Sequence, residues 1–166
     1  MKKFTLRPKQ KVSVNMTRFI FLDFDGVLNS SAYFDSIVKD EIYGGGFDSM
    51  IDEKAVALVN QLVDKTQASV IVSSTWRLFQ DLPALQRTLD AAGATFKLAG
   101  ATRNLNGAMR GVEIQDYMDS NPCDSFVILD DVDNMGKLKP FLIQTSYDDG
   151  LKQEHIDKAV RLLVGV

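Results

Sequence analysis

Three short runs of β-branched and aromatic residues constrain the fold of this chain more than any other feature. They are residues 18–23 (RFIFLD), 68–73 (ASVIVS) and 125–130 (SFVILD). Runs with an apolar centre of this length are typical of strands that are buried on both faces, as in a parallel sheet covered by helices. Each run therefore predicts a central strand, and each strand ends in a polar residue.

The stretches between these strands have helical spacing. Asp52 is placed to cap a helix over residues 53–65. A second apolar stripe, which Gly93 would end, is formed by Phe79, Leu82, Leu85 and Leu89. We also expect strands at residues 95–99 and 141–145 and helices at 111–119 and 153–164. This alternation predicts an α/β fold, a Rossmann-like open parallel sheet sandwiched by helices.

The length of 166 residues, 45% of them hydrophobic, leaves room for one domain. We place it at residues 18–166. Residues 1–17 form a basic N-terminal extension, either an arm or an edge strand. Residues 29–50 have no clear period and predict a short flap or lid. The chain has one cysteine and no long apolar run, so we expect a cytoplasmic protein with no membrane contact.

The first strand ends in an acid pair, Asp23 and Asp25, followed by Gly26. Two carboxylates at this spacing, before a glycine that permits a sharp turn, can divide the work of phosphoryl transfer. One attacks phosphorus, and the other handles the proton of the leaving group. An Asp-rich turn is the alternative, but the string FLDFDGVLN is more specific than a generic turn.

The other two strands end in groups that fit the same chemistry. The hydroxyl of Ser73, or of Ser74 if the strand ends one residue later, is suited to hold phosphate oxygens beside the start of a helix. Asp130 and Asp131 are adjacent acids that would repel each other unless a cation lies between them, and carboxylate oxygens suit Mg²⁺. Ligands bind beyond the carboxyl ends of parallel strands, so we expect these side chains to converge.

Together these residues resemble the haloacid dehalogenase (HAD) superfamily, which has a DxDG motif, a strand-end Ser or Thr, and a late pair of acids. The resemblance implies that Asp23 is the nucleophile that becomes an aspartyl phosphate, and that Asp25 is the general acid/base. It implies that Ser73 contacts the phosphoryl group. It also implies that Asp130, Asp131, Asp23 and the backbone carbonyl of Asp25 hold Mg²⁺.

The superfamily has a further basic residue, usually Lys, that neutralises charge on the phosphoryl group. Arg110, 20 residues before Asp130, is our choice for it, and Lys97 is the alternative. The string RGVEIQDYM, which contains Arg110, and the string FVILDDVDNM also resemble the compact HAD phosphatase domain of bacterial and phage Swiss-army-knife RNA-repair proteins. That branch implies a phosphatase, with nucleic-acid ends as a candidate substrate.

Neither interval that holds a cap domain in this superfamily is long enough for one here, so we expect an open site with a minimal cap or none. An open site admits a nucleotide or polynucleotide-end phosphate. The basic N-terminus, Trp76, Arg77 and Arg103 are candidates for phosphate contacts and base stacking. Their structural alternatives are packing for Trp76, an ion pair for Arg77 and solvent exposure for Arg103.

Two other functions remain open. The chain can be a small-molecule nucleotidase or phosphotransferase with residues 29–50 as its lid. It can also be a non-catalytic binding module in a nucleic-acid repair complex. The charge of −3 argues against a protein that coats nucleic acid, and the sequence does not fix the oligomeric state.

Overall fold

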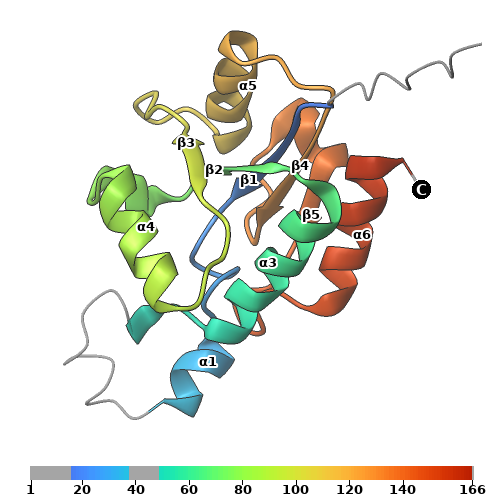
Figure 1. The fold of residues 1–166 in the computed structure, drawn as a ribbon. Helices are drawn as coiled ribbons and strands as arrows, with labels where there is room; N and C mark the ends of the chain where they lie inside the picture. The colour runs from blue at the N-terminus through green and yellow to red at the C-terminus, as the bar shows by residue number, and fades with distance from the viewer. Residues whose placement is uncertain (1–15, 38–48, 166) are drawn as a thin grey trace, which may run out of the picture.

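The computed structural model describes residues 16–37 and 49–165, which form a single five-stranded parallel sheet with helices on both faces (Figure 1). The strands lie in the order β3-β2-β1-β4-β5. Their bounds are β1 Arg18–Leu22, β2 Ser69–Val72, β3 Leu98–Ala101, β4 Ser125–Asp130 and β5 Leu142–Gln144. The predicted α/β class and open parallel sheet are confirmed.

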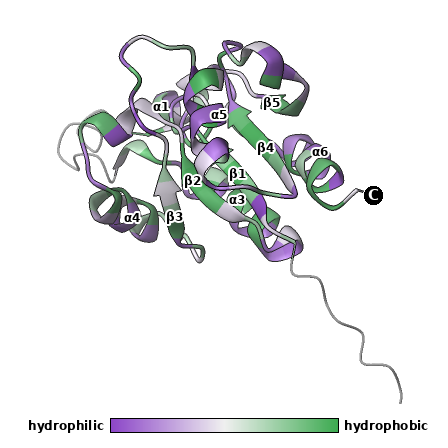
Figure 2. Ribbon diagram, turned by 90° about the horizontal axis from the view of Figure 1, so that it is seen from above, coloured by the Kyte–Doolittle hydropathy of each residue, from purple (hydrophilic) through white to green (hydrophobic). Residues whose placement is uncertain are grey.

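Side chains of the central strands alternate between the two faces, as the period of two in a strand requires. In β1, Ile20 and Leu22 lie in the larger apolar cluster, and Phe19 and Phe21 lie in the smaller one. The neighbouring strands β2 and β4 alternate in the same way. The central strands are accordingly the hydrophobic middle of the molecule in Figure 2.

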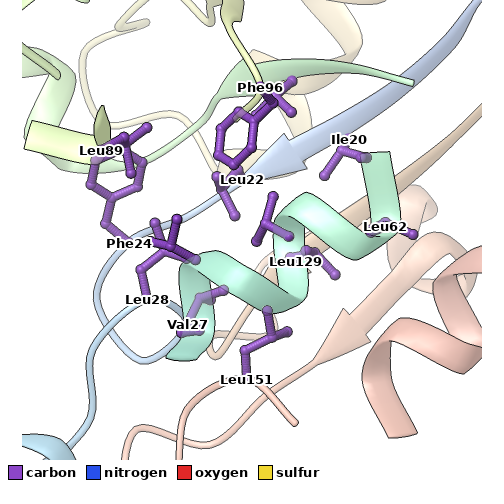
Figure 3. Packing of buried hydrophobic residues seen from close by; sticks show 14 of the residues in the cluster. Ile20, Leu22, Phe24, Val27, Leu28, Leu62, Leu89, Phe96, Leu129 and Leu151 are labelled. Atoms are coloured by element: carbon purple, nitrogen blue, oxygen red, sulfur yellow. The ribbon is translucent and has the colours of Figure 1, made fainter. Parts of the chain in front are cut away.

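The larger cluster is covered by α3 (Glu53–Thr66), α4 (Leu82–Ala91) and α6 (Gln153–Val164). Figure 3 shows Ile20, Leu22, Leu62 and Leu129 from this cluster gathered around α3. The opposite face is covered by α5 (Arg110–Ser120) and the 3₁₀ helix η3 (Gly136–Phe141). Two further short elements, α1 (Ser31–Ser36) and the 3₁₀ helix η2 (Thr75–Leu78), follow the ends of β1 and β2.

Most predicted helices are confirmed. Asp52 caps α3 by accepting a hydrogen bond from the backbone N–H of Lys54 at 2.8 Å. The second predicted helix does not include Phe79, which ends η2 and is 78% exposed. Asp81 starts α4 afresh by accepting from the N–H of Ala84, with Pro83 in the first turn. Such a start is favoured by an acidic cap and an early proline.

The strand predicted at residues 95–99 is displaced, since β3 begins at Leu98. The residues before it bond to helix side chains instead of a neighbouring strand. The N–H of Thr95 donates to Asn60 Oδ1 at 2.9 Å, and Gln86 Nε2 donates to the carbonyl of Phe96 at 3.2 Å. These side-chain partners replace the strand ladder before Leu98.

The predicted flap at residues 29–50 is described only in part. Residues 31–36 form α1, whose first turn is tied to a distant loop: the N–H of Ser31 donates to the carbonyl of Tyr147 at 2.9 Å. A short helix thus forms where the sequence has no clear period, and residues 38–48 lie outside the described residues. So do residues 1–15 of the predicted extension. The flap or lid itself stays a prediction. In the described chain, no helix is long and apolar enough to cross a membrane.

Candidate active site

The site lies where the order of the strands reverses. The chain runs outward from β1 to β2 and β3, then returns to place β4 on the other side of β1. The crevice at such a switch point is where open parallel sheets bind ligands. Asp23 and Asp130 stand on the two sides of it, and the backbone N–H of Asp23 donates to the carbonyl of Leu129 at 3.0 Å.

Three of the predicted carboxylates converge at this point. Asp23, Asp130 and Asp131 each offer an oxygen within 4.8 Å of the others, and Asp23 and Asp130 are buried. Arg110 Nη1 contacts two of them, lying 3.1 Å from Asp23 Oδ2 and 2.9 Å from Asp130 Oδ2. Among the described residues, Arg110 is the only basic side chain paired with this cluster. One cation against three carboxylates leaves an excess of negative charge.

That excess shifts the pKa values of the cluster. Burial, with the nearby charge of Asp23, raises the pKa of Asp130 to about 7, although Arg110 acts in the opposite direction. Burial and Asp23 also raise the pKa of Asp131. Burial alone would lower the pKa of Arg110, but Asp23 and Asp130 outweigh it and raise that pKa above its ordinary value. A cation between the carboxylates would relieve this repulsion.

The cluster has the chemistry of a magnesium site. All the ligand atoms that the cluster offers are carboxylate oxygens, which are the hard donors that Mg²⁺ prefers. Protein sites usually bind Mg²⁺ through one or two carboxylates, and water and substrate phosphate take the remaining coordination positions. The raised pKa values of Asp130 and Asp131 are a second sign of charge that a divalent cation would balance. The residues present therefore fit this metal.

The backbone around Gly111 explains how Arg110 reaches the cluster. Arg110 is the first residue of α5, and the N–H of Gly111 donates to the carbonyl of Asn134 at 3.3 Å. A Cβ at Gly111 would lie 2.1 Å from the carbonyl oxygen of Met135. Only glycine lets α5 pack this closely on the loop after β4. Lys97, the alternative basic residue, is exposed and paired with Asp90 instead.

Two features of the structure require glycine at position 26. The φ of Gly26 is +71°, in the left-handed region. A Cβ there would also lie 2.5 Å from Cγ of Asp131. The carbonyl of Gly26 accepts a hydrogen bond from Thr145 Oγ1 at 2.7 Å, which holds the turn against the end of β5. The turn after β1 thus lies directly against Asp131, the residue that follows β4.

Asp25 lies outside the three-carboxylate cluster, and its side chain has its own partners. Trp76 Nε1 donates to Oδ2 of Asp25 at 2.9 Å, and Asn29 Nδ2 donates to Oδ1 at 2.9 Å. Sequence reasoning missed both donors. Asn29 is four residues from Asp25 in the string DGVLN, a local signal, whereas Trp76 is 51 residues away and only the tertiary fold brings it near.

The structure separates the two candidate serines. Ser74 Oγ accepts from the N–H of Trp76 at 3.3 Å and so caps η2. Ser73 is fully buried, and its Oγ has no hydrogen-bond partner among the described residues. Because a buried hydroxyl without a partner is costly, this atom is the one available for a phosphoryl oxygen.

Arg77 and Arg103 are both engaged in ion pairs. Arg77 contacts Glu113 of α5 at 2.5 Å and donates to the carbonyls of Ser73, Ser74 and Thr102. The structural alternative for Arg77 is thereby confirmed. Arg103 is exposed and paired with Asp116 through two hydrogen bonds. Trp76 is only 6% exposed and packs on Phe24, so it offers no open stacking surface.

One known family matches the chain. The HAD domain in Swiss Army Knife RNA repair proteins matches residues 19–156, which is most of the sequence and includes every residue of the site described above. Searches of curated proteins and of solved structures returned no match. A HAD domain indicates phosphatase-type hydrolase activity in general, and HAD proteins generally use Mg²⁺. The chain belongs to the HAD-like superfamily, as a HAD domain of the Swiss Army Knife RNA-repair type.

Proposed function

We propose that this protein is a Mg²⁺-dependent phosphomonoesterase that acts through an aspartyl phosphate on Asp23. One observation carries the proposal: Asp23, Asp130, Asp131 and Arg110 converge at the switch point of the sheet. Phosphoryl transfer depends mainly on positioning and on stabilising negative charge, and this cluster is suited to both.

The protein residues have distinct roles in this mechanism. A carboxylate oxygen of Asp23 attacks phosphorus as the bond to the leaving oxygen breaks, and Asp25 donates a proton to that oxygen. Water then gives a proton to Asp25 and attacks the phosphorus of the aspartyl phosphate, which releases phosphate and restores Asp23. Arg110 and the Ser73 hydroxyl bind the phosphoryl oxygens throughout.

Asp23, Asp130, Asp131 and the backbone carbonyl of Asp25 would hold the magnesium ion. When bound, Mg²⁺ supplies charge stabilisation to the phosphoryl oxygens. The excess negative charge of the three carboxylates supports this assignment.

The proposed substrate is the terminal phosphate of a nucleic acid, in keeping with the RNA-repair proteins that the matched family describes. A depression of about 220 Å³ beside Arg110 is lined by Thr75, Leu78, Asn104 and Asn134, among others. It is smaller than the roughly 300–1,000 Å³ of typical small-molecule pockets. A substrate larger than this depression would extend into solvent, as a polynucleotide does.

The first test is phosphate release from an aryl phosphate with Mg²⁺, with EDTA and with Asp23→Asn. We expect release by the wild type alone. Asp133→Asn is a matched control, because Asp133 is an aspartate that follows β4, as Asp131 does, but it is paired with Lys139 outside the cluster. Release by Asp23→Asn at the wild-type rate would exclude Asp23 as the nucleophile.

Two further measurements address the intermediate and the substrate. Asp25→Asn, acid-quenched after reaction with a ³²P-labelled aryl phosphate, should retain protein-bound label that hydroxylamine removes and that Asp23→Asn lacks. Comparing a mononucleotide with 5′- and 3′-phosphorylated oligoribonucleotides tests the substrate. Preference for the mononucleotide would favour the small-molecule nucleotidase instead.

A further inference from the structure

Both carboxylate oxygens of Asp25 are held by side chains from different parts of the fold. Trp76 Nε1 donates to Oδ2 and Asn29 Nδ2 donates to Oδ1, each at 2.9 Å. Each oxygen has two lone pairs, so each keeps one lone pair for a proton or a water molecule. The two donors therefore fix the plane of the carboxyl group without using up its capacity for proton transfer.

The donor from Trp76 is itself firmly placed. The indole ring is buried and packs on Phe24, with ring centroids 5.2 Å apart. The backbone N–H of Trp76 is capped by Ser74 Oγ, and its carbonyl accepts from the N–H groups of Phe79 and Gln80, each at 3.0 Å. The position of the indole N–H is thus fixed by the end of β2.

Asn29 is equally constrained from the β1 side. It is buried, and its Oδ1 accepts from the N–H of Gly26 at 3.0 Å while its Nδ2 reaches Asp25. Asn29 therefore ties Asp25 to its own turn, whereas Trp76 ties it to the neighbouring strand end. The contact from Trp76 is the one that links the carboxyl group of Asp25 to the strand end that carries Ser73.

We propose that Trp76 is a positioning residue for proton transfer: its indole N–H holds Asp25 in the orientation from which it protonates the leaving oxygen. The inference rests on the proposed phosphatase function. In the step concerned, the Asp23–phosphorus bond forms, the bond from phosphorus to the leaving oxygen breaks, and the proton of Asp25 passes to that oxygen. The alcohol that leaves is then neutral.

This role has a signature that a purely structural role lacks. An alkyl phosphate has a strongly basic leaving oxygen and needs the proton, whereas a nitrophenyl phosphate has a weakly basic one and does not. The value of kcat/KM reports on steps up to departure of the leaving group. We expect Trp76→Phe, which keeps an aromatic ring and loses the N–H, to lower kcat/KM for glycerol 2-phosphate by roughly tenfold to a hundredfold. The value for p-nitrophenyl phosphate should fall by less than about threefold, since proton donation contributes little there.

A second replacement removes the N–H with almost no change in shape. The chain has one tryptophan, so incorporating 3-benzothienylalanine in place of tryptophan changes Trp76 alone. Its sulfur stands where the indole N–H was, and the bicyclic ring keeps its packing on Phe24. This protein should show the same selective loss on glycerol 2-phosphate, even if Trp76→Phe fails to fold.

The Asp25→Asn background completes the test. Because Trp76 acts through Asp25, adding Trp76→Phe to Asp25→Asn should cause no further selective loss on glycerol 2-phosphate. An equal loss on both substrates, or no loss, from the benzothienyl protein would overturn the inference while leaving the phosphatase function standing. A wild type that hydrolyses neither substrate would overturn both.

Discussion

The amino ends and the carboxyl ends of the strands, here called the amino edge and the carboxyl edge of the sheet, differ in how their polar groups are paired. At the amino edge two polar side chains have backbone partners: Arg18 donates to the carbonyls of Leu163 and Thr66, and Ser125 Oγ donates to the carbonyl of Leu163. At the carboxyl edge, three carboxylates share Arg110, and Ser73 Oγ has no partner among the described residues. The same strands thus carry partnered polar groups at their amino ends and an excess of negative charge at their carboxyl ends.

The difference indicates that the carboxyl edge contributes less to the stability of the fold than the amino edge does. Partnered polar groups at the amino edge each contribute about 1 kcal/mol, whereas buried like charges and orphaned hydroxyls oppose folding. Strained or repulsive groups that persist in a structure are concentrated at functional sites. The carboxyl edge is therefore expected to respond to Mg²⁺ and to substitutions in ways that the amino edge does not.

The largest contrast is expected from the two arginines. Arg110→Met leaves the carboxylates without their cation and should lower the free energy of unfolding by roughly 3–5 kcal/mol without metal. Mg²⁺ should restore much of this loss. Arg18→Met should cost roughly 1–2 kcal/mol for its two hydrogen bonds, with no restoration by Mg²⁺. Urea unfolding of both variants with and without Mg²⁺ measures the contrast, and equal metal responses would contradict it.

A pair of glycines gives the next largest effect. Gly26→Ala combines a positive φ with a clash against Asp131, and should cost about 3 kcal/mol. Gly165, at the end of α6, has a φ of +73°, and a Cβ added there would meet nothing within 4 Å. Gly165→Ala should cost only about 1 kcal/mol for the strain. Similar thermal shifts for the two variants would show that Asp131 moves aside easily.

The pH dependence of stability should also come from the carboxyl edge. The pKa of Asp130 is raised to about 7 in the folded protein. Its contribution to the free energy of unfolding is therefore fully present below its unfolded pKa and is lost as the pH rises through 7. Without metal, the free energy of unfolding should fall by about 1 kcal/mol between pH 6 and 8. Asp130→Asn should flatten this slope. An unchanged slope in that variant would assign the pH dependence to another group.

The smallest contrast is between two serines. Ser125→Ala removes a hydrogen bond to Leu163 and should cost about 1 kcal/mol. Ser73→Ala removes an unpartnered hydroxyl and should leave stability unchanged or slightly higher, yet lower kcat/KM by about tenfold through the lost phosphoryl contact. Thermal melts paired with turnover measurements separate the two. A clear loss of stability in Ser73→Ala would show that its hydroxyl is satisfied in solution.

Much of the carboxyl edge was predictable because its residues follow buried strands directly. Asp23, Ser73 and Asp130 each come next to, or at the end of, an apolar run, and parallel strands bring such ends together. The resemblance predicts a basic residue at this site, but the geometric reason that it is Arg110 is visible only in the packing of Gly111 on Met135.

Other features depend on contacts between distant segments. The indole of Trp76 donates a hydrogen bond to Asp25, which is 51 residues away in the sequence, and no periodicity or motif predicts that bond. The start of β3 is set by side chains of Asn60 and Gln86, so the propensity of residues 95–99 for a strand was overridden. The separate starts of η2 and α4 depend on the N-caps Ser74 and Asp81. The apolar stripe from Phe79 to Leu89 predicted one continuous helix instead.

The contacts of Arg77 have a thermodynamic consequence for substrate binding. Its guanidinium joins the end of β2 to Glu113 on α5, the helix that also supplies Arg110. The two halves of the site, which come from opposite sides of the switch point, are thereby fastened to each other during folding. The conformational entropy of this ordering is lost during folding, before any substrate binds, so substrate binding requires little reorganisation of these two halves.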